Sequence, residues 1–166
     1  MPAPAPAEGD SSAQIAVATR TDAAPVLVEW AIRTSDLVTC ETVTPELRRV
    51  RHQYGDRVRL VAYAVDTDVR LVQSFLRKER LARVDLQPRT ERAFQADYAR
   101  RFGSAASAPT LLMVSQGATA QTFDATARTT SGRQGIARFA AYLDGIVNRE
   151  SLAGGPPPVS FTVRGD

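Results

Sequence analysis

Two apolar runs separated by a helical pattern constrain the fold of this chain most strongly. Residues Val26–Ala31 are apolar at every position except Glu29, and residues Val58–Val65 form a second run with a single charge. Nearly continuous apolar runs of this length are typical of strands covered on both faces. Residues Glu41–Tyr54 show helical spacing between the two runs. The sequence therefore predicts two central strands joined through a helix, in the α/β class.

The rest of the chain extends this unit in the same alternating manner. Turn and cap residues separate the further segments, which we expect to be a helix over Val69–Arg80, a short strand over Leu81–Leu86, a helix over Glu91–Phe102, strands over Leu111–Val114 and Ala120–Phe123, and a helix over Gly132–Val147. This order predicts a central mixed sheet flanked by helices, closed at one edge by an antiparallel hairpin.

The segment before and inside the first helix carries two special features. Residues Ile32–Thr39 read as a loop in which Asp36 or Thr39 can cap the helix. Pro45 falls inside the helical pattern, where proline removes a hydrogen bond. We therefore expect a kink at Pro45.

The composition of the chain ends sets the domain boundaries. The 166 residues suit one domain, which we place at residues 22–148. Residues 1–21 are rich in proline and alanine and residues 149–166 in glycine and proline, so both are expected to be flexible tails. No apolar run approaches the ~20 residues of a membrane span. No signal peptide is visible, so the sequence as it stands predicts a cytoplasmic protein; removal of a leader or anchor would place it in the periplasm.

Charge and rare residues restrict the partners and cofactors. The chain has 21 basic and 18 acidic residues, and their interleaving predicts a solvated mixed-charge surface without nucleic-acid binding. Cys40 is the only cysteine, which excludes a disulfide within the chain and a cysteine-rich zinc site. His52 is the only histidine, which excludes a histidine-based metal cluster. We expect no metal and no cofactor.

Several segments occur together in an order that resembles a known family. Trp30-Ala31 ends the first strand, and Pro45 follows Cys40 by five positions. The segments VRLVAYAVDTD and FQADYARRFGSAASAPTLLMV come later in the same order. Over residues 22–148 this set resembles the thioredoxin superfamily, in particular the bacterial thiol–disulfide proteins of the TlpA/ResA type. The resemblance implies a thioredoxin-like fold with a strand–helix insert.

The resemblance also identifies a candidate site with one thiol missing. The first cysteine of Cys-x-x-Cys corresponds to Leu37, and the second to Cys40. Pro109 corresponds to the cis-proline that faces the site in this family. With Trp30, Ala108 and Thr110, it would form a groove for a client protein or peptide.

Glu29 and Cys40 each leave two interpretations open. Glu29 resembles the family's buried proton acceptor, but it could equally pair with an arginine. Cys40 could be an inert buried thiol or a monothiol that forms mixed disulfides with glutathione or a client. A peroxiredoxin site is excluded, because Arg33 and Leu37 stand where that motif has proline and threonine or serine.

Three functions remain in competition. The first is a non-catalytic protein- or peptide-binding module, chaperone-like or part of an assembly. The second is a monothiol thiol–disulfide oxidoreductase that uses Cys40, and the third is a structural subunit without a binding groove. A dithiol oxidoreductase is not expected, because a second thiol is needed to release the mixed disulfide.

Overall fold

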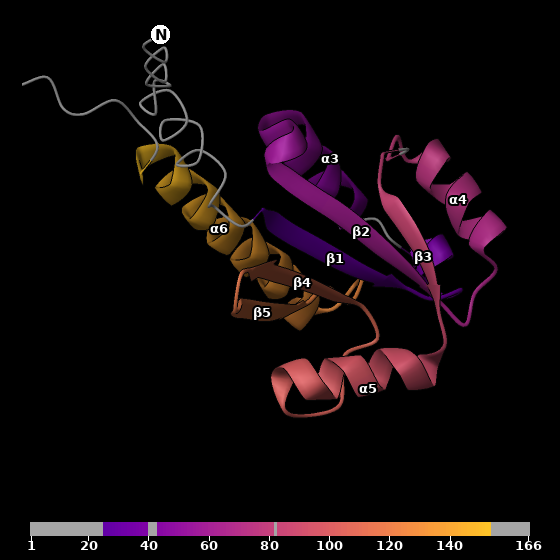
Figure 1. The fold of residues 1–166 in the computed structure, drawn as a ribbon. Helices are drawn as coiled ribbons and strands as arrows, with labels where there is room; N and C mark the ends of the chain where they lie inside the picture. Colours follow the sequence, from indigo (N-terminus) through magenta and orange to yellow (C-terminus); the bar gives the residue numbers. More distant parts are fainter. Residues whose placement is uncertain (1–24, 40–42, 82, 154–166) are drawn as a thin grey trace, which may run out of the picture.

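The computed structural model describes residues 25–39, 43–81 and 83–153 (Figure 1). In chain order the elements are β1 (Val26–Ile32), α2 (Asp36–Thr39), α3 (Val43–Tyr54), the 3-10 helix η1 (Gly55–Arg57), β2 (Val58–Val65), α4 (Val69–Lys78), β3 (Asp85–Arg89), α5 (Glu91–Phe102), β4 (Leu111–Gln116), β5 (Thr119–Asp124) and α6 (Thr130–Ala153). The bounds of β2 and α5 are those predicted from the sequence. The α/β class is confirmed.

The strands form one mixed sheet in the order β3-β2-β1-β4-β5. Strands β1, β2 and β3 are parallel to one another, whereas β4 is antiparallel to β1 and β5 is antiparallel to β4. This topology is a thioredoxin-like fold in which α4 and β3 form the strand–helix insert. The predicted fold class, including the insert and the closing hairpin, is confirmed.

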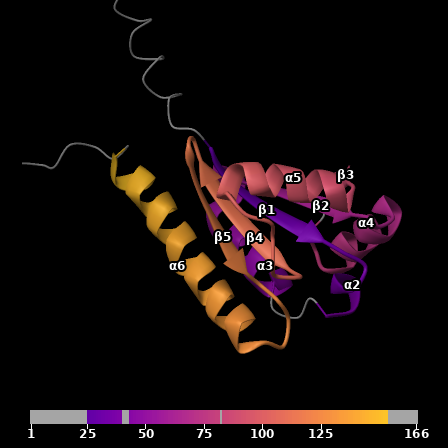
Figure 2. The same cartoon turned by 90° about the horizontal axis from the view of Figure 1, so that it is seen from below.

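The two faces of the sheet carry different side chains because successive residues of a strand point in opposite directions. Val28, Trp30 and Ile32 of β1 belong to the cluster that also holds residues of α3, α4 and α6. Ala31 of β1 belongs to a smaller cluster with residues of α5. Helices α3, α4 and α6 therefore cover one face, and α5 covers the other (Figures 1 and 2).

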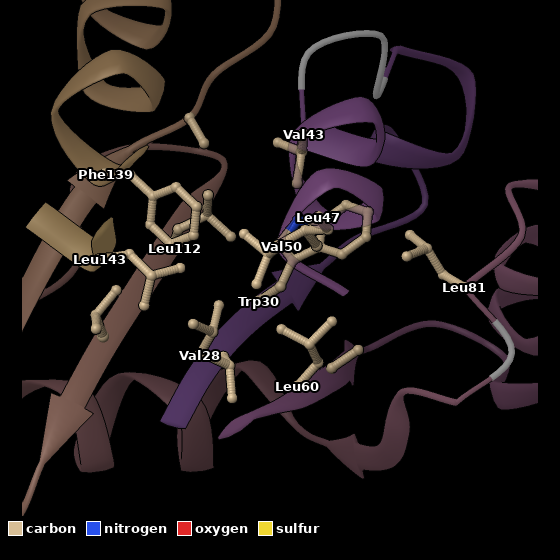
Figure 3. Packing of buried hydrophobic residues seen from close by; sticks show 14 of the residues in the cluster. Val28, Trp30, Val43, Leu47, Val50, Leu60, Leu81, Leu112, Phe139 and Leu143 are labelled. Carbon is tan, nitrogen blue, oxygen red and sulfur yellow. The ribbon is translucent and has the colours of Figure 1, made fainter. Parts of the chain in front are cut away.

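The larger cluster forms the main core. Trp30 and Phe139 are its largest fully buried side chains, and Leu47, Leu112 and Leu143 surround them (Figure 3). Burying a side chain of this size contributes roughly 1.5–3 kcal/mol relative to exposure. Most of the stability therefore comes from this face of the sheet, between α3 and α6.

Pro45 is the third residue of the described helix α3, whose first described residue is Val43. Residues 40–42 lie outside the described residues. The kink at Pro45 therefore stays a prediction.

Strand β3 and helix α6 differ from their predicted bounds. Strand β3 begins at Asp85 and not at Leu81. Leu81 instead ends α4: the N–H of Leu81 donates to the carbonyl of Leu76 at 2.7 Å, and the Leu81 side chain is buried. Helix α6 continues to Ala153, past the predicted domain end at residue 148. The rest of both predicted tails, residues 1–21 and 154–166, lies outside the described residues.

Helix α6 begins in close contact with β5, and two glycines permit this approach. A Cβ atom at Gly135 would lie 1.7 Å from the carbonyl oxygen of Asp124, and one at Gly132 would lie 1.9 Å from that of Thr126. Real Cβ atoms do not approach backbone oxygen so closely. Any side chain at Gly135 must therefore push α6 away from the sheet.

We expect Gly135→Ala to lower the free energy of unfolding by about 3 kcal/mol or more, because the methyl group displaces a core helix. Urea denaturation measures this loss. Gly145→Ala is the matched control in the same helix, since a Cβ atom there meets nothing within 4 Å. It should stabilise the protein by about 0.5–1 kcal/mol through helix propensity. A similar loss of unfolding free energy in both variants would contradict the close contact between α6 and β5.

Candidate functional site

The candidate site lies at the carboxyl edge of the parallel strands. Strands β1, β2 and β3 all end at this edge, and β4 begins there because it runs antiparallel to β1. The segments that follow or precede these ends are 33–36, 66–68, 89–91 and 108–110. Open α/β sheets commonly place ligands at such an edge, where the connections diverge from a central strand.

Asp36 joins the end of β1 to the start of β4. It is only 4% exposed, and it is the first residue of the short helix α2, which stands within the predicted loop. Its two carboxylate oxygens accept hydrogen bonds from the Arg33 backbone N–H at 2.7 Å and from the Thr110 hydroxyl at 2.6 Å. Asp36 therefore fixes the loop after β1 instead of capping the longer helix that follows.

The Arg33 side chain spans the same edge. Its Nε and Nη2 atoms donate to the two carboxylate oxygens of Glu91 at 3.0 and 2.8 Å, and its Nη1 atom donates to the Pro109 carbonyl at 2.7 Å. The guanidinium also lies over the ring of Phe94, 5.3 Å from its centre. The hydrogen bond from Arg33 lowers the pKa of Glu91. Arg33 thus ties β1, α5 and the start of β4 together.

Pro109 does not have the predicted cis bond. Every peptide bond among the described residues is trans, the Ala108–Pro109 bond included. The Pro109 ring is exposed, but its carbonyl is bound to Arg33, Ala108 packs beside the α5 cluster and Thr110 is buried against Asp36. The cis-proline prediction is wrong. The backbone there is held by Arg33 and does not offer that carbonyl to a peptide.

Leu37 occupies the position that the resemblance assigns to the first thiol. Its side chain is partly buried and packs against the main core. It therefore supports the loop and supplies no nucleophile. Cys40, the predicted monothiol, lies outside the described residues.

Glu29 points to the α5 side of the sheet and is 3% exposed. It forms a two-point ion pair with Arg101, at 2.8 and 3.1 Å, and accepts a hydrogen bond from the Tyr63 hydroxyl at 2.6 Å. Burial and this hydrogen bond raise the pKa of Tyr63. Of the two interpretations left open by the sequence, the structure therefore places Glu29 in the arginine pair.

Trp30 points to the opposite face and is 1% exposed. Its ring packs edge-on against Phe75, with 6.3 Å between the ring centres, and its Nε1 has no hydrogen-bond partner in the described part of the chain. Trp30 is a core residue and contributes no surface to a groove, contrary to the prediction. The large apolar ring is more stable in the core than at an exposed edge.

A hollow that the sequence did not indicate opens beside this network. It has a volume of about 410 Å³ and is lined by Ala64, Asp66, Thr67, Pro88, Arg89 and Thr90. Asp66 has a φ of 46°, in the left-handed region. From sequence, residues 66–68 read only as a turn and helix cap, and Asp68 does cap α4. The hollow arises because β2 and β3 end side by side, a pairing that no local pattern reveals.

No group of three or more potential metal-ligating side chains occurs among residues 25–39, 43–81 and 83–153. Within the same ranges, no helix is both long enough and apolar enough to cross a membrane.

Comparisons with known proteins give a likeness at the level of structure. No family model and no curated protein matches the sequence. Among solved structures, the chain is similar to a secreted Mycobacterium tuberculosis disulfide oxidoreductase homologous to E. coli DsbE. The identity is 20%, the match covers 70% of this chain and 81% of that chain, and the TM-score is 0.46. The fold described above rests on the strand order of this chain itself.

The Arg33–Glu91 pair predicts a specific pH dependence of stability. Because the folded pKa of Glu91 lies below its ordinary value of 4.5, the pair stabilises the protein above that pH and is lost as pH falls through the folded pKa. The melting temperature of Arg33→Gln should therefore differ most from wild type near neutral pH, and less below about pH 4.5. In a Glu91→Gln background the effect of Arg33→Gln should not vary with pH. If Arg33→Gln changed the melting temperature by the same amount at every pH in both the wild-type and the Glu91→Gln background, the pairing would be contradicted.

We expect Arg101→Met to lower the free energy of unfolding by about 3 kcal/mol, because it leaves the buried carboxyl group of Glu29 without its ion-pair partner. Arg100→Met is the matched neighbour: its side chain is 77% exposed and its ion pair with Asp97 lies at the surface. That variant should change the free energy by less than about 1 kcal/mol. Chemical denaturation measures both variants. Equal losses of unfolding free energy would show that the burial of Glu29 does not depend on its ion pair with Arg101.

Proposed function

We propose that this chain is a non-catalytic thioredoxin-fold module that binds a protein or peptide segment at the carboxyl edge of its sheet. The observation that carries the proposal is Leu37, an apolar side chain packed against the core where a dithiol site has its attacking thiol. The chain has one cysteine, so a mixed disulfide cannot be resolved within it.

The geometry of the edge supports binding in two ways. Asp36 and Arg33 hold the loop after β1 in one arrangement, which reduces the ordering cost of association. Beside them, the hollow above Ala64 and Pro88 has an apolar floor, with Asp66 and Arg89 on its rim. These features suit a side chain of a bound segment. Recognition would use this hollow in place of backbone pairing at Pro109.

The absence of dithiol catalysis predicts no turnover. In an insulin-reduction assay with dithiothreitol, wild-type protein and Cys40→Ser should precipitate insulin at the same rate as buffer with dithiothreitol alone. Turnover by wild type above the Cys40→Ser level would overturn the proposal and favour the monothiol oxidoreductase.

Binding at the edge is tested with an unfolded client, carboxymethylated α-lactalbumin. Thr67→Arg places a long cation in the hollow and should weaken binding about tenfold, roughly 1.4 kcal/mol. Gln121→Arg, an exposed position on β5, is the control and should bind as wild type does. Circular dichroism checks that both variants fold. If all three proteins bind equally, or none binds, the edge is not the binding site.

A further inference from the structure

The outer side of α4 and the turn that follows it carry an unusual set of cations. Five exposed basic side chains occur in this segment, and no hydrogen bond or ion pair involves their charged groups in the described part of the chain: Arg70, Arg77, Lys78, Arg80 and Arg83. By contrast, most arginines that face other elements are paired, for example Arg33, Arg48 and Arg101. The segment flanks β3 at the end of the molecule opposite α6 (Figure 1).

The acidic residues near this set are already engaged. Glu79 binds Arg48 of α3 at 3.1 Å, and Asp85 binds Arg59 of β2 at 2.9 Å. Asp68 caps the start of α4 by accepting from the Arg70 backbone N–H. The interleaving of charges in the sequence therefore does not neutralise this surface, because the acids pair with arginines from other elements.

A hollow lies between α4 and β3 beside these cations. Its volume is about 280 Å³, and its lining is Gln73, Leu76, Arg77, Val84 and Leu86. Three of these side chains are apolar. Arg70, Gln73 and Arg77 follow one another along one side of the helix, so Arg77 borders the hollow and Arg70 lies further along the same side. Three apolar side chains beside these cations suit an apolar side chain flanked by carboxylates.

Arg80 stands where glycine is the usual residue. The N–H groups of Arg80 and Leu81 donate to the carbonyls of Arg77 and Leu76, the two hydrogen bonds of a Schellman motif. The residue at this position has a positive φ, here 60°, which strains any side chain but is free of cost for glycine. The motif thus keeps a cation in the turn after α4 at the expense of stability.

We propose that the groove between α4 and β3 docks an acidic segment of a partner protein. An apolar side chain of the segment fills the hollow over Leu76, Val84 and Leu86, and its carboxylates pair with Arg70, Arg77 and Arg80. This surface is separate from the carboxyl-edge hollow above Ala64, so it does not depend on the function proposed for that edge.

A protein segment fits these features better than a nucleic acid or a membrane. No phenylalanine, tyrosine or tryptophan side chain among the described residues is exposed, so that part of the chain does not offer these rings as stacking platforms for bases. Leu71, 55% exposed, is the only large apolar side chain exposed in the same residues, which is too little to insert into a bilayer. A polyanion would also leave the apolar hollow empty.

The test uses a short fluorescein-labelled peptide rich in glutamate with one central leucine, measured by fluorescence anisotropy at low salt. Wild type should bind it, and the variant R70E/R77E/R80E should bind at least about tenfold more weakly. The control R92E/R138E/R149E has the same net charge and alters exposed arginines elsewhere. It should bind as wild type does. Equal loss in both triple variants would overturn the proposal in favour of a net-charge effect.

Two further measurements separate the parts of the proposal. Replacing the leucine of the peptide by serine should weaken binding severalfold, and an unchanged affinity would show that the hollow is not used. Arg80→Gly should raise the melting temperature and weaken peptide binding, since it removes strain and a cation together. Tighter binding of an oligothymidine or of anionic phosphatidylglycerol vesicles than of the peptide would overturn the choice of partner. The Thr67→Arg variant should bind the peptide normally, which distinguishes this surface from the carboxyl edge.

Discussion

Strand β1 is hydrogen-bonded on both sides, and the rest of the molecule depends on this constraint. It pairs in parallel with β2 and antiparallel with β4, and six of its seven residues are buried. A strand in this position must satisfy all its backbone groups within the sheet and bury both rows of side chains. Trp30 consequently anchors the core under α3, while Glu29 needs Arg101 and Tyr63 on the other face. The same strand delivers Arg33 to the carboxyl edge.

Arg33 determines the character of that edge. A guanidinium with fixed fork geometry can bind a carboxylate and a carbonyl at once, and here it binds Glu91 and the Pro109 carbonyl. In the family that the sequence resembles, thiol chemistry takes place at this edge. In this chain, the hydrogen bonds of Arg33 hold the same edge together. What remains open is the neighbouring hollow between the ends of β2 and β3. The binding role that we propose uses this hollow.

The strand–helix insert adds a second surface with different chemistry. Helix α4 buries Val72 and Leu76 in the core and turns its cations outward, while Glu79 and Asp85 are bound by arginines of α3 and β2. The charge of a surface thus depends on which partners the fold supplies to each acid and base, as well as on the local sequence. One hollow lies at the ends of β2 and β3, and the other lies between α4 and β3.

The sequence by itself determined the class, the order of the strands and longer helices, and most of their bounds to within two residues. Local signals suffice for these, since apolar runs mark buried strands, and Thr90 and Gly103 mark the ends of α5. The resemblance also assigned the position of the first thiol to Leu37. Only the tertiary structure decided that Glu29 pairs with Arg101, that Trp30 is buried, that the Ala108–Pro109 bond is trans and that Arg33 holds the Pro109 carbonyl. These outcomes join residues far apart in the chain. They depend on the register and packing of strands and helices, which no local pattern contains.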